Sequence, residues 1–401
     1  MPSRTPSEGT YVIVGGGAPA AGAVEGLREG GCAAPVLLLA EEPLLPYERR
    51  RLTGDYLSGA VDEDALLVHP QDWYDDLGVI VELGTRPVAL HPAQREVELD
   101  GGRWVGYERL LLAPRNAPAR PASEGELAGV HRVHTLADAA RLRARLSQGG
   151  RVVVVGGSWT GLEIAAAARA HGAAVTVLEA DATPLFWLLG PELGEVLADV
   201  HRAHGVDVRT GVRIDGIEAG AGGPAVRTSR GLLAAETVVL AGEAAPDLTL
   251  AAAAGLAGAG TLPTDALLRT ADPYVYAVDA DSLADGYGQG LAAGRSMAGK
   301  GEPWENPPLL RTRQYDLEAE LRGCAPPGAY DAVVLRGEDE GEDDESMEQF
   351  LAFWLRRGHV VAALSVNVAG AGEVLERLVR AGAAVDADAL ADPGRPLLSL
   401  L

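Results

Sequence analysis

The sequence predicts an α/β fold with two separate βαβ units and a smaller α+β region after them. An apolar, β-branched segment at residues 11–14 leads into a glycine-rich turn and an alanine-rich segment, and the same order recurs from residue 151. Each alanine-rich segment is followed by another apolar stretch, at residues 36–39 and 175–178. Because parallel strands need a crossover connection, usually a helix, this order predicts a parallel sheet in each unit.

Short strand-like segments extend both units, and a different pattern follows them. In the first unit they lie at residues 79–83, 88–90, 96–99 and 107–112, and in the second at 206–209, 213–218, 226–229 and 237–240. After residue 306 we expect strands at 330–336 and 359–367, an apolar run at 350–355 and an amphipathic helix at 373–381. The acidic segment 337–346 predicts a solvated loop, because like charges at that density repel one another.

Length and charge limit the classes of partner. A chain of 401 residues exceeds what one hydrophobic core usually serves, so we expect two or three domains. The net charge of −23 lacks the positive field that attracts nucleic acid or anionic lipid. The start of the sequence shows no apolar signal region, and the longest charge-free apolar stretch, 248–262, is too short to span a bilayer. We therefore expect a cytoplasmic protein with neither a nucleic-acid nor a membrane partner, and the sequence gives no indication of its oligomeric state.

Cysteine and histidine spacing predicts no metal site. Cys32 and Cys324 are too far apart in the sequence for a CxxC redox pair or a four-ligand zinc cluster. His201 and His204 have a spacing that places both on one side of a helix, but no third ligand lies near them in the sequence. We expect them to form a solvated helix end.

The first glycine turn has the pattern of a dinucleotide site. Gly15, Gly17 and Ala20 give GxGxxA at a strand-to-helix junction, where backbone amides and the helix dipole can hold a diphosphate. Glu41 or Glu42 follows about 20 residues later, where a ribose hydroxyl needs an acceptor. A tight turn without a ligand is the alternative interpretation.

The second turn has the same design with one departure. Gly156, Gly157 and Gly161 are present, but Ser158 stands where the middle glycine of GxGxxG belongs, so its side chain should crowd a phosphate. Glu179 ends the next strand, and no arginine follows within the next eight positions. This favours NAD over NADP, with a solvated strand end as the alternative role of Glu179.

Together with these turns, several segments resemble the flavoprotein ferredoxin and rubredoxin reductases of the pyridine nucleotide-disulphide oxidoreductase superfamily. They are residues 42–49 (EPLLPYER), 161–163 (GLE), 190–194 (GPELG), 201–206 (HRAHGV) and 314–317 (QYDL). The resemblance covers nearly the whole chain. It implies two Rossmann-like domains: an FAD-binding type, split between residues 1–115 and 243–305, and an NAD-binding type at 116–242. A C-terminal α+β domain at 306–401 follows.

The resemblance also implies an activity and roles for single residues. In the family, NADH gives hydride to FAD, which passes single electrons to a small, ferredoxin-like iron–sulphur protein. Arg49 is then expected at the phosphates or adenosine of FAD, and Glu163 near the nicotinamide as the candidate catalytic residue. Because such partners are acidic, a local arginine patch, around 49–51 or at Arg311 and Arg313, is expected on the docking face.

Departures from the family pattern gather around the flavin. Pro114 and Arg115 replace residues that allow a close backbone approach, and Gly54 replaces a lysine. Asp279 or Asp281 serves in place of the family's flavin-binding aspartate only if the loop shifts by one residue, and the stretch that follows lacks the family's tryptophan.

Three hypotheses therefore stay open. The first is a diverged FAD-dependent NADH oxidoreductase of the ferredoxin reductase type. The second is a flavin-deficient paralogue that binds a partner or small molecule without redox turnover. The third is an NAD sensor, which the bulk of Ser158 disfavours.

Overall fold

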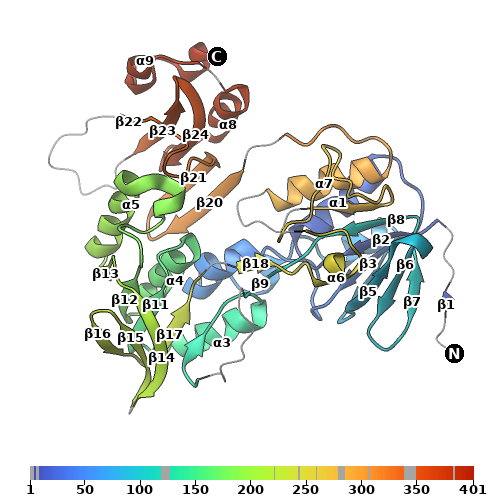
Figure 1. Cartoon of the computed structure of the whole chain (residues 1–401), viewed down its shortest axis with the longest axis horizontal. Helices are drawn as coiled ribbons and strands as arrows, with labels where there is room; N and C mark the ends of the chain where they lie inside the picture. The colour runs from blue at the N-terminus through green and yellow to red at the C-terminus, as the bar shows by residue number, and fades with distance from the viewer. Residues whose placement is uncertain are drawn as a thin grey trace. The chain divides into compact units, whose positions relative to one another are not determined.

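The computed structural model describes residues 4–5, 9–118, 127–220, 222–242, 244–258, 260–278, 285–305, 308–337, 349–382 and 384–401. Its helices and strands are shown in Figure 1. By contacts within the chain they form two compact units. Unit 1 comprises residues 1–49, 62–119 and 244–305, and unit 2 comprises 50–61, 120–243 and 306–401. The sequence placed residues 50–61 in the FAD-type domain, and the three-domain division stays a prediction.

Unit 1 is built on a five-stranded parallel sheet of order β19-β8-β2-β3-β4. The strands are β2 (Tyr11–Val14), β3 (Val36–Ala40), β4 (Val79–Leu83), β8 (Arg109–Leu112) and β19 (Val275–Ala277). Helices α1 (Ala18–Glu29) and α7 (Gly286–Met297) share a core with one face of this sheet, and short α2 (Gln71–Asp76) lies next to β4. All of β3 and the two central residues of β2 are buried, as expected for parallel strands covered on both faces.

Smaller elements cover the other face of the sheet. They are α6 (Thr249–Ala253) and a four-stranded sheet of order β1-β7-β6-β5, made of β1 (Arg4–Thr5), β5 (Pro87–His91), β6 (Glu96–Leu99) and β7 (Trp104–Gly106). An antiparallel pair of β9 (Asn116–Pro118) and β18 (Ala244–Pro246) lies where the chain leaves unit 1 and returns to it.

Unit 2 contains a second parallel sheet, of order β10-β17-β11-β12-β13. Its strands are β10 (Val130–His131), β11 (Arg151–Val155), β12 (Ala174–Leu178), β13 (Asp207–Arg209) and β17 (Thr237–Leu240). Helices α3 (Leu136–Leu146), α4 (Trp159–Ala170) and α5 (Phe186–Ala203) connect them, together with an antiparallel sheet of β14 (Ile214–Gly220), β15 (Gly223–Thr228) and β16 (Gly231–Ala234). Thr135 begins α3 with a capping box that includes Asp138.

The rest of unit 2 is an antiparallel sheet of order β20-β21-β24-β23-β22. Its strands are β20 (Leu309–Gln314), β21 (Leu317–Gly323), β22 (Ala332–Gly337), β23 (Phe350–Arg356) and β24 (His359–Val366), with helices α8 (Gly372–Ala381) and α9 (Ala387–Ala391). The α/β prediction, with two parallel sheets and a C-terminal α+β part, is thus confirmed. Residues 338–346 of the predicted acidic loop lie outside the described residues.

Helices α1 and α7 meet along a seam of glycines. A Cβ atom at Gly22 or Gly26 of α1 would lie 2.2 or 2.1 Å from a backbone oxygen of α7. In the reverse direction, a Cβ at Gly290 or Gly294 of α7 would lie 2.0 or 2.2 Å from a backbone oxygen of α1. Since real Cβ atoms do not approach backbone this closely, the seam requires glycine on both helices.

We predict that Gly26→Ala destabilises unit 1 although alanine favours helices. The added methyl would lie 2.1 Å from the Leu291 carbonyl oxygen, so the two helices must separate. Overpacking of this kind costs about 1–3 kcal/mol, which lowers the melting temperature by about 2–4 °C per kcal/mol. Thermal unfolding measures it, with Gly258→Ala as control because a Cβ there meets nothing within 4 Å. Equal melting temperatures for both variants would contradict the seam.

Candidate functional site

The first glycine turn leaves the start of α1 open to an anion. A Cβ at Gly15 would lie 2.7 Å from the carbonyl oxygen of Ala113, so the turn and the loop after β8 approach too closely for any side chain. Gly17 is the N-cap of α1, and no side chain caps the helix there. Pro19 lies in the first helical turn, where its missing N–H costs nothing. This arrangement suits the diphosphate of a dinucleotide.

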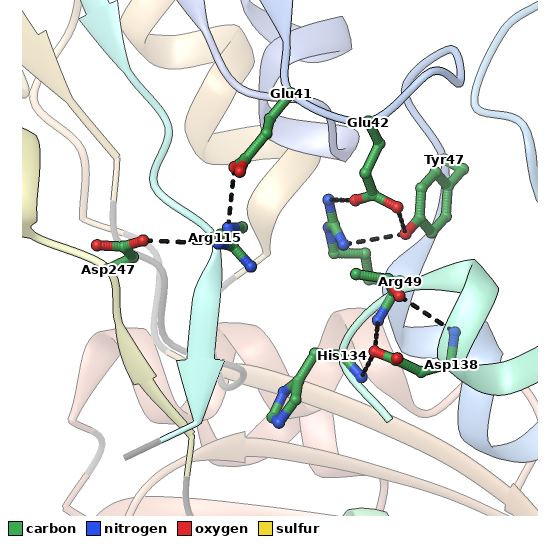
Figure 2. A network of polar contacts seen from close by, with 9 residues as sticks. Glu41, Glu42, Tyr47, Arg49, Arg115, His134, Asp138 and Asp247 are labelled. Carbon is green, nitrogen blue, oxygen red and sulfur yellow. Dashed lines mark hydrogen bonds and ion pairs between the residues drawn. The ribbon is translucent and has the colours of Figure 1, made fainter. Parts of the chain in front are cut away.

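Glu42 is held by two neighbours beside this turn. Its carboxylate accepts a hydrogen bond from the Tyr47 hydroxyl at 2.9 Å and pairs with the Arg49 guanidinium at 2.5 Å. Arg49 also donates to the Tyr47 hydroxyl at 3.0 Å, and its guanidinium lies over the Tyr47 ring. Figure 2 shows the three side chains converging. Glu42 is therefore engaged in a structural cluster.

Glu41 has a different partner, which comes from the loop after β8. Its Oε2 lies 3.2 Å from Nε of Arg115, and Nη2 of Arg115 lies 3.8 Å from Oδ2 of Asp247. In Figure 2 the Arg115 guanidinium lies between the two carboxylates. Because Glu41 directly follows β3 and is not part of the Glu42 cluster, it is the better placed of the two glutamates to accept ribose hydroxyls.

Asp279 and Asp281 lie outside the described residues. Asp285 is the N-cap of α7, and its carboxylate accepts a hydrogen bond from the Gly288 N–H at 3.2 Å. A side-chain cap thus starts α7, whereas none starts α1.

The second glycine turn is closed tightly by backbone. A Cβ at Gly156 would lie 2.9 Å from the Ala241 carbonyl oxygen, and one at Gly161 would lie 2.1 Å from the Gly156 carbonyl oxygen. Ser158 is the N-cap of α4: its hydroxyl accepts from the Gly161 N–H at 3.2 Å and donates to the Ala241 carbonyl at 2.7 Å. The serine therefore supplies a helix cap, a role that the sequence prediction of phosphate crowding missed.

Glu179 lies directly over this second turn. It follows β12, and its carboxylate accepts hydrogen bonds from the Gly157 N–H at 2.6 Å and the Asp181 N–H at 2.9 Å. Arg209, at the end of the neighbouring strand β13, pairs with Asp207. Glu179 is therefore an acceptor for ribose hydroxyls at this turn. Arg209, at the end of the next strand, is already paired with Asp207 and is not set aside for a 2′-phosphate.

Glu163, the predicted catalytic residue, is buried in the second turn of α4. Its side chain is 7% exposed, and its carboxylate accepts hydrogen bonds from the hydroxyls of Thr53 and, at 2.7 Å, Thr312. Burial raises the pKa of Glu163 to about 7, and the two hydroxyls and the more distant Arg50 only partly oppose this effect. Glu163 therefore exchanges a proton near neutral pH.

The threonines that hold Glu163 come from distant parts of the chain. Thr53 lies in a π-helical turn at residues 52–56, and Thr312 lies on β20. A Cβ at Gly54 would lie 3.9 Å from the Glu163 carboxyl carbon, so a longer residue there would face this acid. Sequence reasoning missed both threonines because neither is near Glu163 in the sequence.

His201 and His204 contact side chains of β20 and the turn that follows it. His201 is buried, and its two ring nitrogens lie 2.8 Å from Oε1 of Gln314 and 3.0 Å from the Tyr315 hydroxyl. Burial lowers the pKa of His201 to about 4. His204 stacks on the Tyr315 ring. His201 is therefore an interior residue, not the solvated one that we predicted, and no cluster of three or more metal-binding side chains occurs in the described part of the chain.

The arginines proposed as a basic docking patch are largely engaged within the chain. In unit 2, Arg311 pairs with Glu320 and Arg313 with Glu318. Arg51 pairs with Asp55, and in unit 1 Arg49 is held by Glu42. Their charges are thus mostly balanced locally.

No helix in the portion of the chain that is described is long and apolar enough to cross a membrane.

Comparisons with known proteins agree with this arrangement. Residues 9–281 match the model of the pyridine nucleotide-disulphide oxidoreductase family, and residues 312–401 match that of the reductase C-terminal domain. The chain belongs to this family. A relative from Burkholderia cepacia, the ferredoxin–NAD(+) reductase component of an anthranilate 1,2-dioxygenase system, is 34% identical over 96% of this chain and 97% of its own.

Solved structures place the chain among the ferredoxin reductases of the family. It matches the structure of a covalent putidaredoxin reductase–putidaredoxin complex with a TM-score of 0.87 and 27% identity over 98% of both chains. It also matches a ferredoxin reductase from Rhodopseudomonas palustris, with a TM-score of 0.88 and 26% identity over 98% of this chain and 99% of that one. The family uses FAD and a nicotinamide dinucleotide. The uncapped start of α1 fits the diphosphate of FAD, and Glu179 at the end of β12 fits the ribose of NAD.

We predict that Glu163 makes stability depend on pH. The folded chain binds its proton more tightly than the unfolded chain does, because the folded pKa is about 7 and the ordinary value is 4.5. This contribution is therefore complete below about pH 4.5 and is lost as the pH rises through 7, up to about 3 kcal/mol.

The Glu163→Gln variant lacks this titration. The melting temperature of the natural chain minus that of the variant should be larger at pH 5 than at pH 8, as measured by calorimetry. Glu218→Gln, at an exposed ion pair on β14, controls for the change in charge. A difference in melting temperature that stays constant with pH would mean that Glu163 does not hold a proton in the fold.

Proposed function

We propose that this ferredoxin reductase takes electrons from NADH, holds FAD, and passes the electrons singly to a small iron–sulphur protein. The observation that supports it best is the pair of glycine turns, each followed at the end of the next strand by a glutamate. Two such turns in one chain suit two dinucleotides, and relatives that match nearly the whole chain are ferredoxin reductases. We place the protein in the cytoplasm, where NADH is available.

Each turn has a defined task in this proposal. The turn from Gly15 to Ala20 holds the FAD diphosphate, and Glu41 accepts the hydroxyls of the adenosine ribose. Arg49, which Glu42 and Tyr47 hold in place, lies beside this ribose. In the second turn, from Gly156 to Gly161, the N–H groups of Gly157 and Gly161 already donate to Glu179 and Ser158, so the remaining amides at the start of α4 hold the NAD diphosphate and Glu179 holds its ribose. FAD, when bound, supplies the hydride acceptor that can release electrons one at a time.

Glu163 is assigned the proton chemistry. A two-electron reduction by hydride also changes the number of protons at the reaction centre, and a buried carboxyl with a pKa of about 7 can hold one at its Oε atoms. The hydroxyls of Thr53 and Thr312 fix the orientation of the carboxyl. Burial among these groups also keeps bulk water from exchanging with it directly.

Glu179 is proposed to select NADH over NADPH. Its carboxylate occupies the position over the second turn where an additional 2′-phosphate would meet a like charge. Glu179→Ala should weaken NADH binding by about 10- to 100-fold, because hydrogen bonds to a charged group are lost, and should leave NADPH binding less affected. Calorimetric titration of both dinucleotides tests this, with Glu195→Ala on α5 as control. An unchanged ratio of the two affinities would remove Glu179 from selection.

The overall activity is tested with the purified chain after incubation with FAD. We expect stoichiometric flavin absorbance, bleaching of that absorbance by NADH without oxygen, and NADH-driven reduction of an added [2Fe–2S] ferredoxin. Omitting the ferredoxin provides the control for direct reaction with oxygen. A protein that gains no flavin absorbance from excess FAD would overturn the proposal and favour the flavin-deficient paralogue.

A further inference from the structure

The ion pair between Arg115 and Glu41 crosses the opening of the first glycine turn. β2 lies between β3 and β8 in the sheet, and all three strands run parallel. Glu41 directly follows β3, and Arg115 follows β8 by three positions. The contact joins the carboxyl ends of the two strands that flank β2, so it spans the edge of the sheet at which the turn from Gly15 to Gly17 begins. Arg115 therefore lies at the place where a diphosphate enters.

The two carboxylates that hold Arg115 are not fixed equally. Asp247 is anchored: its N–H donates to the Arg115 carbonyl at 2.8 Å, and its carboxylate accepts from the Thr249 N–H at 3.2 Å. It also follows β18, which pairs with the strand that begins just after Arg115. Glu41 has only the ion pair with Arg115 among the interactions of the described residues. Of the two ion pairs of Arg115, the one with Glu41 is therefore the easier to break.

The charges beside the first turn favour an interaction of Arg115 with the diphosphate of a dinucleotide. The described side chains of the two networks beside the turn include three carboxylates, of Glu41, Glu42 and Asp247, and two guanidiniums. Arg49 is committed to Glu42 and Tyr47. The side chains of Arg115 and Glu41 are 36% and 43% exposed, and ion pairs this exposed contribute little, so opening the pair costs less than pairing with a diphosphate returns.

We propose that Arg115 is a switching ligand for the FAD diphosphate. Before binding it is held by Glu41 and Asp247, and on binding it releases Glu41 to the adenosine ribose and turns to the diphosphate. The side chain that interrupts the family pattern at this position is thus an added cation for the cofactor. The inference rests on the proposed function, because it requires that the chain bind FAD.

The test is equilibrium binding of FAD to the apoprotein, followed by quenching of FAD fluorescence. Arg115→Ala should weaken FAD binding by about 10-fold or more and reduce its dependence on salt. Arg103→Ala is the matched control, because Arg103 lies in the same unit, is 38% exposed and pairs with Glu82. Asp247→Asn should tighten FAD binding by about 2- to 5-fold, since it removes a competitor for Arg115.

Competing ligands separate a diphosphate contact from a structural effect. In Arg115→Ala, competition by ADP should weaken, whereas competition by adenosine should stay equal or strengthen because Glu41 is released. If Arg115→Ala fails to fold, the binding of FAD, ADP and adenosine is measured with Arg115→Lys and Asp247→Asn instead. If the natural chain binds FAD and Arg115→Ala binds it equally well or more tightly, the inference is wrong and the proposed function stands. If the natural chain binds no FAD, both are overturned.

Discussion

The close approach of backbone to backbone at the glycine turns is the constraint on which the rest of the structure depends. At Gly15 and Gly156 the turn passes within contact distance of the loop that follows a neighbouring parallel strand. A helix can then start directly above the strand and direct its first amides to the carboxyl edge of the sheet. Every residue assigned to a cofactor in this chain is defined by its position relative to one of these two turns.

The acidic residues at that edge show how one design serves two settings. Glu179 rests on its own turn through the Gly157 amide, whereas Glu41 is drawn to an arginine from the loop after β8. The contact of Glu179 with the Gly157 amide orders the second turn without a ligand. The contact of Glu41 with Arg115 keeps a positive charge beside the first turn. Equivalent motifs in the sequence therefore have different electrostatic surroundings in the fold.

Much of this organisation is predictable from the sequence, and the remainder has identifiable physical reasons. The glycine turns and the flanking strands follow from local pattern, and β4, β6 and β17 have the predicted bounds. The cluster of Glu163 with Thr53 and Thr312 is not predictable in this way, because it joins α4, a π-helical turn and β20 through tertiary packing alone. The spacing of His201 and His204 and the lack of a third ligand nearby in the sequence predict a solvated helix end, but Gln314 and Tyr315 contact the buried His201 ring. The ion pair of Arg115 likewise depends on strand order, which a sequence motif does not contain.

The glycine seam between α1 and α7 has a consequence for biosynthesis. The two helices are separated by more than 250 positions, with most of unit 2 encoded between them. Until the ribosome has released α7, the glycine face of α1 has no partner helix, and this side of the first sheet is incompletely covered. The nascent protein is therefore expected to need protection of α1 during translation, and truncation before residue 286 should yield an aggregating product.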